Sequence, residues 1–385
     1  MRISDCVLYV GVDDKEIDLF EGQYAVPNGV SYNSYIIMDD KIAIMDTVDK
    51  RKSKEWIANV EEALQGKEPD YLVISHMEPD HSGSIQMLAE KYPKMKLVGN
   101  AKTFRMVEQF FTLDSKDRSV VVKEAEELSL GEHTLVFYMA PMVHWPEVMV
   151  SYEKKEKILF SADGFGKFGA LDVDEPWNDE ARRYYINIVG KYGSFVQALL
   201  GKAAMLDIEK ICPLHGPVLE KDLGHYIGLY DTWSSYRPEE KGVVIAYATV
   251  YHNTEKAAML IRDKLKEAGE QNVLLFDLAR SDMSKVIAHA FQYDRMIIGA
   301  PTYDGGIFPI MDDFLHHLKA KAYQKRRVGI IENASWAAIA GKLMRKHLEE
   351  MKEIEIIEPV VTVTSAVKKE TEQCIDELVK NCMKS

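Results

Sequence analysis

The chain has 385 residues, of which 46% are apolar and 28% are charged, so it is long enough for two globular domains of ordinary composition. Its formal net charge of −13 argues against a nucleic-acid partner, because a phosphate backbone requires a basic face. No stretch approaches the ~20 consecutive apolar residues that a membrane-spanning helix needs, and the first residues do not have the pattern of a signal peptide.

The cysteines limit the redox chemistry of the chain. They are Cys6, Cys212, Cys374 and Cys382, and no two of them form a C-x-x-C pair. This spacing excludes an iron–sulfur or rubredoxin-type centre within this chain, since such centres need clustered thiolates. A disulfide framework is also not expected. We therefore predict a cytoplasmic protein with no membrane partner.

The first 240 or so residues mix short apolar runs with helical patterns. Strands are predicted over residues 6–12, 31–38, 41–46, 71–74, 97–98 and 127–138, with helices around 56–64, 85–90 and 104–111. Residues 236–241 are polar and contain a proline, which is typical of a boundary between domains. We therefore predict two domains, 1–240 and 241–385.

The densest group of candidate ligands lies in residues 75–81, S-H-M-E-P-D-H. An apolar strand precedes this stretch and a helical pattern follows it, so we expect a loop that a rigid scaffold holds in place. Four side chains that can bind a metal fall within six positions: His76, Glu78, Asp80 and His81. Without a metal, such groups would need many separate partners if they were buried.

Three later stretches repeat one design, in which an apolar strand leads to a single candidate ligand beside Gly or Pro. These ligands are His144, Asp163 and His215, whereas His133 and His225 lie outside the pattern and are interpreted as ordinary. The complete set has four imidazoles, three carboxylates and no thiolate. It can hold two divalent ions if one carboxylate bridges them, and it suits iron or manganese better than zinc.

Regular alternation of strands and helices follows the boundary. The predicted strands are 242–248, 272–278, 295–300, 327–331 and 354–363, which indicates a doubly wound parallel sheet. Ligands of such sheets bind beyond the carboxyl ends of the strands, where loops 249–255, 301–306 and 332–337 are expected. The first loop opens a helix and combines hydroxyls with free N–H groups, as anion sites do. The candidate contacts are Thr249, Tyr251, His252, Asn253, Thr254, Pro301, Thr302, Tyr303, Asp304, Gly305, Asn333, Ala334, Ser335 and Trp336.

These motifs resemble two known patterns in series. Residues 76–81 resemble the H-x-H-x-D-H metal loop of the metallo-β-lactamase superfamily, but Glu78 replaces the second His, as in the flavodiiron proteins. The three later loops resemble those of flavodoxin, in which the first holds the FMN phosphate and the others flank the isoalloxazine ring. Here His252 stands where flavodoxins usually have Gly, and Val250 where they have Ser or Thr. The resemblance implies a metallo-β-lactamase-like αββα sandwich followed by a flavodoxin-like doubly wound parallel sheet.

The flavodiiron resemblance also implies an activity. Members pass electrons through FMN to two iron ions, which reduce dioxygen to water or nitric oxide to nitrous oxide. One iron would be held by His76, Glu78 and His144, the other by Asp80, His81 and His215, and Asp163 would bridge them. Because no rubredoxin or flavin-reductase extension is found, the electron donor is expected to be a separate rubredoxin. The family also implies a head-to-tail homodimer, in which the FMN of one chain faces the irons of the other.

Three other functions were weighed against this one. A zinc hydrolase of the same superfamily would have His at position 78 and no flavin domain. A plain electron-transfer flavoprotein would have lost metal ligands, and none is lost here. Direct oxidation of a reduced deazaflavin remains open, and the sequence is compatible with oxygen and nitric oxide alike.

Overall fold

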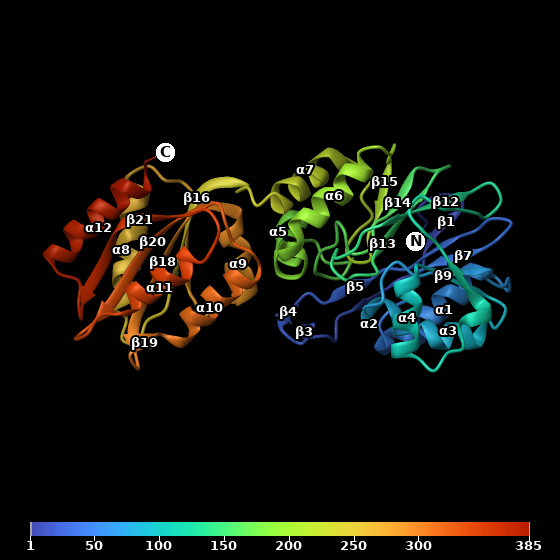
Figure 1. The fold of residues 1–385 in the computed structure, drawn as a ribbon, viewed down its shortest axis with the longest axis horizontal. Coiled ribbons are helices and arrows are strands. Elements are labelled where there is room, and N and C mark those ends of the chain that lie inside the picture. The colour runs from blue at the N-terminus through green and yellow to red at the C-terminus, as the bar shows by residue number, and fades with distance from the viewer. Residues whose placement is uncertain (1, 385) are drawn as a thin grey trace. The chain divides into compact units, whose positions relative to one another are not determined.

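The computed structural model of the protein describes residues 2–384 and divides into two compact units (Figure 1). The first unit comprises the residues up to Tyr185 together with Ser194–Asp231, and the second comprises Ile186–Gly193 and the residues from Thr232 onward. Within the described range, every helix is too short or too polar to cross a bilayer.

The first sheet of unit 1 has the strand order β1-β6-β7-β8-β9-β10. Its strands are β1 (Val7–Tyr9), β6 (Tyr35–Ile37), β7 (Ala43–Met45), β8 (Tyr71–Val73), β9 (Lys96–Gly99) and β10 (Ser119–Val121). Strands β7 to β10 run parallel, and β6 is antiparallel to both of its neighbours. The helices beside this sheet are α1 (Ser53–Leu64), α3 (Ile85–Lys91) and α4 (Ala101–Phe110) (Figure 1). Helix α1 buries Trp56, Val60 and Leu64, the residues whose spacing predicted it.

The second sheet of unit 1 has the order β11-β12-β13-β14-β15. Its strands are β11 (Glu127–Ser129), β12 (Thr134–Met139), β13 (Met149–Glu153), β14 (Ile158–Phe160) and β15 (Lys210–Cys212). Helices α5 (Trp177–Tyr184), α6 (Gly193–Ala203) and α7 (Leu223–Ser234) lie beside it (Figure 1). Side chains such as Met45 and Val73 from the first sheet pack with Phe137 and Phe160 from the second. The predicted αββα sandwich is confirmed.

Smaller elements complete unit 1. They are the paired strands β2 (Val12–Asp14) and β5 (Val30–Tyr32), the paired strands β3 (Leu19–Phe20) and β4 (Tyr24–Ala25), and the short helix α2 (Pro79–Ser82). The strand predicted over 6–12 is two strands, because β1 pairs with β6 in the first sheet whereas β2 pairs with β5 in a separate one. A Cβ atom at Gly11 would lie 2.5 Å from the carbonyl oxygen of Tyr32. Helix α2 stands where a loop was expected, and it begins at Pro79, which suits the first turn of a helix.

Unit 2 contains one parallel sheet of order β17-β16-β18-β20-β21, and β19 pairs antiparallel with the end of β18. Its strands are β16 (Glu240–Tyr247), β17 (Val273–Asp277), β18 (Tyr293–Tyr303), β19 (Gly306–Ile307), β20 (Arg326–Ala334) and β21 (Ile354–Thr364). The helices are α8 (Asn253–Glu267), α9 (Met283–Gln292), α10 (Pro309–Ala320), α11 (Ala340–Glu349) and α12 (Lys369–Cys382). Helix α8 contacts α12, whereas α10 contacts both α9 and α11, so helices cover both faces. The predicted doubly wound parallel sheet is confirmed, with its strand order reversing between β16 and β18.

Candidate metal centre and flavin site

The seven candidate metal ligands follow strand ends of both sheets in unit 1. His76 follows β8 of the first sheet, and Glu78, Asp80 and His81 come directly after it. His144, Asp163 and His215 follow β12, β14 and β15 of the second sheet, which all point in the same direction. Packing of the two sheets therefore brings together ligands that are far apart in the sequence. His76 and His215, for example, are 139 positions apart.

Four of the ligands form the first ligand group: His76, Glu78, His144 and Asp163. Oε2 of Glu78 lies 2.9 Å from Nε2 of His144 and 3.3 Å from Nε2 of His76. Oδ2 of Asp163 lies 3.3 Å and 3.4 Å from the same two nitrogens. Two imidazoles and two carboxylates thus point at one small volume.

The second ligand group consists of Asp80, His81 and His215. Nε2 of His81 lies 3.1 Å from Nε2 of His215, and Oδ2 of Asp80 lies 3.3 Å and 3.2 Å from these two atoms. Two imidazole nitrogens that face each other this closely share one space that a cation fits. All three residues are buried.

Asp163 joins the two ligand groups. Its Oδ2 faces His76 and His144, and its Oδ1 lies 3.2 Å from Nε2 of His81 in the second group. Both of its oxygens are buried, and neither makes a well-formed hydrogen bond although imidazole nitrogens lie nearby. The two oxygens of Asp80 are in the same situation. Buried oxygens that face nitrogen lone pairs without a hydrogen bond fit a bound metal ion.

Neighbouring groups fix the orientation of the ligand rings, and the sequence patterns had not singled them out. Nδ1 of His76 donates to Oε1 of Glu147 at 2.8 Å, and Nδ1 of His215 donates to the carbonyl oxygen of Ser31 at 2.7 Å. Both rings then direct Nε2 into the site. Asp46 accepts the N–H of Ser75 at 2.7 Å, which fixes the start of the ligand stretch. Such outer contacts set the tautomer and basicity of metal-binding histidines.

The charges of the site balance one another in the absence of metal. Burial opposes ionisation of Asp163, but the nearby imidazoles of His76, His144 and His81 hold the pKa of Asp163 well below its usual range. Burial likewise lowers the pKa of His76, whereas the carboxylates of Asp163, Glu147 and Glu78 raise it well above the ordinary value. Protons on the imidazoles therefore occupy the positions that metal cations would take.

In unit 2, the candidate flavin contacts gather at the carboxyl ends of β16, β18 and β20. Residues 301–303 and 332–334, which were expected in loops, are the last residues of β18 and β20. The hydroxyl of Thr249 is buried and has no hydrogen-bond partner among the described residues. No side chain caps the start of α8, so the N–H groups of its first turn face outward from the same loop. An unpaired hydroxyl beside uncapped N–H groups fits an anion such as a phosphate.

Aromatic side chains surround this loop cluster. Tyr251 and Trp336 are each 83% exposed, and Tyr303 is 44% exposed. Large apolar rings are seldom left this exposed, and their position at the switch point of the sheet fits a planar ring ligand. The remaining candidates on these loops lie at the same edge: Asn253, Thr254, Pro301, Asp304, Gly305, Asn333, Ala334 and Ser335.

Two of the candidate flavin contacts have a structural task. Oγ1 of Thr302 accepts the N–H groups of Ile339 and Ala340, both at 3.1 Å, and so caps α11. His252 adopts φ +63°, a left-handed conformation that glycine adopts most easily, which explains why flavodoxins usually have Gly at this position. Its ring lies 2.6 Å from the carboxylate of Glu255.

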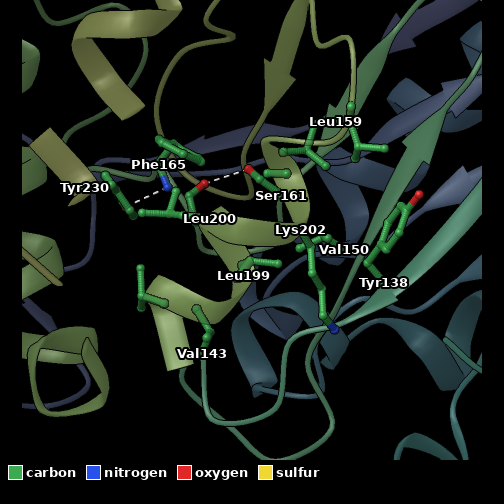
Figure 2. Close-up of a pocket in the computed structure, with 14 residues that line it drawn as sticks. Tyr138, Val143, Val150, Leu159, Ser161, Phe165, Leu199, Leu200, Lys202 and Tyr230 are labelled. Carbon is green, nitrogen blue, oxygen red and sulfur yellow. Dashed lines mark hydrogen bonds between the residues drawn. The ribbon is translucent and has the colours of Figure 1, made fainter. Parts of the chain in front are cut away.

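An apolar cavity lies between α6 and the second sheet (Figure 2). About 20 Å³ of it is open to the centre of a water-sized sphere, which is room for about one small molecule. Its lining includes Leu199 and Leu200 from α6 and Val150 from β13. The cavity also touches Val143 and Gly164, the neighbours of the ligands His144 and Asp163. The seven candidate metal ligands are not part of its lining.

Comparisons with known proteins agree with both units. Residues 30–216 match the family described as ODP family beta lactamase, and residues 244–381 match a flavodoxin domain. A nitric oxide reductase from Moorella thermoacetica is 32% identical, over 94% of this chain and 93% of its own. A rubredoxin-oxygen oxidoreductase from Megalodesulfovibrio gigas is 30% identical, over 91% of this chain and 89% of its own. The solved structure of rubredoxin oxygen:oxidoreductase from Desulfovibrio gigas superimposes with a TM-score of 0.93 at 27% identity, covering 99% of this chain and 97% of that one.

Proposed function

This chain belongs to the flavodiiron proteins, and we propose that it reduces dioxygen, nitric oxide or both at a diiron site that receives its electrons through FMN. The observation that carries the proposal is the position of Asp163, whose two oxygens face the two ligand groups. A shared carboxylate between two such groups fits two metal ions side by side. We assign the diiron domain to residues 1–240 and the FMN domain to residues 241–385.

Each residue of the two ligand groups has a role in this proposal. His76, Glu78 and His144 hold one iron, Asp80, His81 and His215 hold the other, and Asp163 bridges them. Glu78 supplies a negative charge where hydrolytic relatives have a neutral histidine, and such a charge favours the higher oxidation states of iron. The abundance of carboxylates and the lack of a thiolate also favour iron over zinc.

The loops of unit 2 are assigned to FMN. Thr249 and the first turn of α8 would bind the phosphate, with Tyr251, His252, Asn253 and Thr254 around it. Tyr303 and Trp336 would flank the isoalloxazine ring. The other contacts proposed for the ring and its substituents are Pro301, Thr302, Asp304, Gly305, Asn333, Ala334 and Ser335.

The cofactors supply the electrons, and the chain supplies the environment. Two ferrous ions and one reduced FMN can give four electrons, the number that the reduction of dioxygen to water needs. His76 and His215 direct their Nε2 atoms toward the proposed iron positions because Glu147 and the Ser31 carbonyl hold their Nδ1–H groups. The rings of Phe20 and Tyr184 lie 5.4 Å from that of His215 and shield it from water. The apolar cavity, whose lining includes the sequence neighbours of His144 and Asp163, is suited to a small apolar gas.

The relatives also guide the choice of electron donor and assembly. One of them is named for rubredoxin, so a separate rubredoxin is the donor that we propose. We further propose a head-to-tail homodimer in the cytoplasm, where the four cysteines, which are all free, would stay reduced. A chain that cannot bind FMN, mixed with a chain that cannot bind iron, should regain activity as a heterodimer. No recovery after confirmed exchange of chains would count against this assembly.

Anaerobic turnover with each gas tests the proposed function. The protein is loaded with iron and FMN, and chemically reduced rubredoxin is supplied as donor, with a reduced deazaflavin in a parallel series. We expect about two irons and one FMN per chain, consumption of at least one gas, and little free hydrogen peroxide from dioxygen. A protein that retains two zinc ions and stays inactive after reconstitution with iron would instead be a hydrolase candidate.

A further inference from the structure

Unit 1 contains another cluster of metal-binding side chains, which we call the Cys6 cluster: Cys6, His133 and Glu156. Each residue offers one ligand atom within 4.8 Å of the other two. His133 is buried, while Cys6 and Glu156 are half-buried and leave one side open. The sequence patterns gave no sign of this cluster, because its members are far apart in the chain and none of them forms a spaced motif.

A fourth residue orients the imidazole of the cluster. Oδ2 of Asp39 accepts Nδ1–H of His133 at 2.8 Å and the backbone N–H of the same residue at 2.7 Å. Nδ1 therefore faces Asp39, and Nε2 points at Oε1 of Glu156 at 3.3 Å. A carboxylate that fixes the far nitrogen of a histidine is the usual outer partner of a metal-binding imidazole.

The Cys6 cluster lies at the opposite edge of the sandwich from the two iron ligand groups. Cys6 precedes β1, and Asp39 follows β6, which is antiparallel to β7 and therefore ends at the edge opposite to the end of β8. His133 precedes β12, whereas His144 follows it. Six residues of extended strand span roughly 20 Å, so the two sites can be loaded and tested separately.

We propose that Cys6, His133 and Glu156 form a third metal site, which binds Zn²⁺ or a similar divalent cation and leaves one position open to water. Thiolate, imidazole and carboxylate are all zinc ligands, and three of them with one open position complete a tetrahedral site. This donor set differs from the iron ligand groups by its sulfur, and so selects a softer cation.

The charge balance of binding is simple. Burial and the charge of Glu156 raise the pKa of the Cys6 thiol, so its sulfur keeps a proton at neutral pH in the absence of metal. The cation displaces that proton into solvent as the Cys6–metal bond forms, and no oxidant or reductant is required. Because Cys6 and Asp39 flank strands of the first sheet while His133 and Glu156 flank strands of the second, the ion would clamp the two sheets together.

Cobalt binding to the protein loaded with iron and FMN tests the proposal. A thiolate bound to Co²⁺ gives a near-ultraviolet charge-transfer band in the difference spectrum, and the iron ligand groups contain no thiolate. We expect one additional Co²⁺ or Zn²⁺ per chain, the thiolate band, and a higher melting temperature. Cys6→Ser should lose the band, whereas Cys374→Ser, the matched control, should keep it. Asp39→Asn should weaken Co²⁺ binding by about 10- to 100-fold and leave the iron content unchanged.

Two results would overturn the third site. The first is that the intact protein takes up no additional metal and gives no thiolate band, which would make His133 only an ion-pair partner of Asp39 and Glu156. The second is that the band persists in Cys6→Ser. If Cys6→Ser does not fold, Glu156→Gln replaces it, because this half-buried side chain keeps its size and loses only its charge. An unchanged Co²⁺ affinity of Glu156→Gln would also refute the site.

Discussion

Nδ1 of His76 and Oε1 of Glu147 are joined by a 2.8 Å hydrogen bond within the core of unit 1. The same carboxylate oxygen accepts the N–H of Met77 at 2.8 Å, so Glu147 holds both the ring and the backbone of the ligand stretch. Burial opposes the charge of Glu147, but the hydrogen bond from His76 keeps its pKa below the usual value. Glu147 is thus a positioning residue for His76, a proposed iron ligand, and is not itself a proposed ligand.

Glu147→Gln should therefore weaken iron binding by about 10- to 100-fold, because the neutral amide no longer increases the basicity of His76. The measurement is iron retention against a graded series of chelator concentrations. Glu108→Gln on the exposed face of α4 is the matched control and should retain iron like the parent protein. Equal retention by both variants would show that Glu147 has no influence on His76.

Asp163→Asn should reduce iron content and turnover more than the loss of a ligand that belongs to one ligand group only. Its two oxygens face different ligand groups, whereas the carboxylate of Glu78 contacts only the first group. We expect Asp163→Asn to lose most of both irons and Glu78→Gln to lose mainly one, as measured by iron per chain and by turnover. Equal iron losses in the two variants would argue against a bridge.

The folding stability of the metal-free protein should depend on pH through the ionisation of His144. Burial lowers the pKa of His144, but the nearby carboxylate of Asp163 and the hydrogen bond to Glu78 outweigh that effect and raise the pKa to about 9. Because the unfolded value is about 6.5, the stabilisation is fully present below pH 6.5 and is lost as the pH rises through about 9. Iron needs the neutral ring, so iron affinity should rise over the same interval.

Thermal unfolding of the metal-free protein between pH 6.5 and about 9 tests whether its stability falls as the pH rises. The melting temperature should fall as the pH rises, and His144→Gln should reduce that slope. A slope that is unchanged in His144→Gln would assign the effect to other groups.

Thr249→Val should separate phosphate binding from ring binding. The substitution keeps the volume of the side chain and removes the unpaired hydroxyl. A hydrogen bond to a charged group contributes about 1.5–3 kcal/mol, so FMN should bind roughly 10- to 150-fold more weakly. Riboflavin, which has no phosphate, should bind Thr249→Val as well as the parent protein. Trp336→Ala should instead weaken both flavins or shift the flavin potential, and an equal loss of FMN and riboflavin in Thr249→Val would contradict the phosphate role.

Filling the apolar cavity should slow the entry of gas. Leu200→Trp places a larger ring in this cavity, and it should lower kcat/KM for the gas more than kcat. Ala198→Trp on the exposed side of α6 is the matched control. Unchanged kinetics in Leu200→Trp, with normal iron and FMN content, would mean that gas enters elsewhere.

Sequence patterns could indicate much of this site because its ligands come directly after apolar strands. His144, Asp163 and His215 each stand at the end of such a strand, and the structure brings them together with residues 76–81. The αββα sandwich and the doubly wound sheet were also predicted correctly. The doubly wound sheet follows from the regular alternation of strands and helices, whereas the sandwich was implied by the resemblance of residues 76–81 to a known metal loop.

The supporting groups could not be predicted in this way. Glu147 and Asp46 are single carboxylates without any spacing rule, and their importance depends on which backbone and ring atoms the fold places beside them. For the same reason Thr302 looked free to contact a ligand, although it caps α11, and His133 looked ordinary although Asp39 orients it. Such roles depend on contacts between residues that are distant in the chain.

The distribution of the iron ligands over both sheets has a consequence for biosynthesis. The first ligand group is complete once the ribosome has released Asp163, whereas the second must wait for β15 and for His215 beyond it. A nascent chain that ends before residue 215 therefore has the ligands for only one iron position. Insertion of the second iron would therefore have to follow synthesis of the last strand of the second sheet.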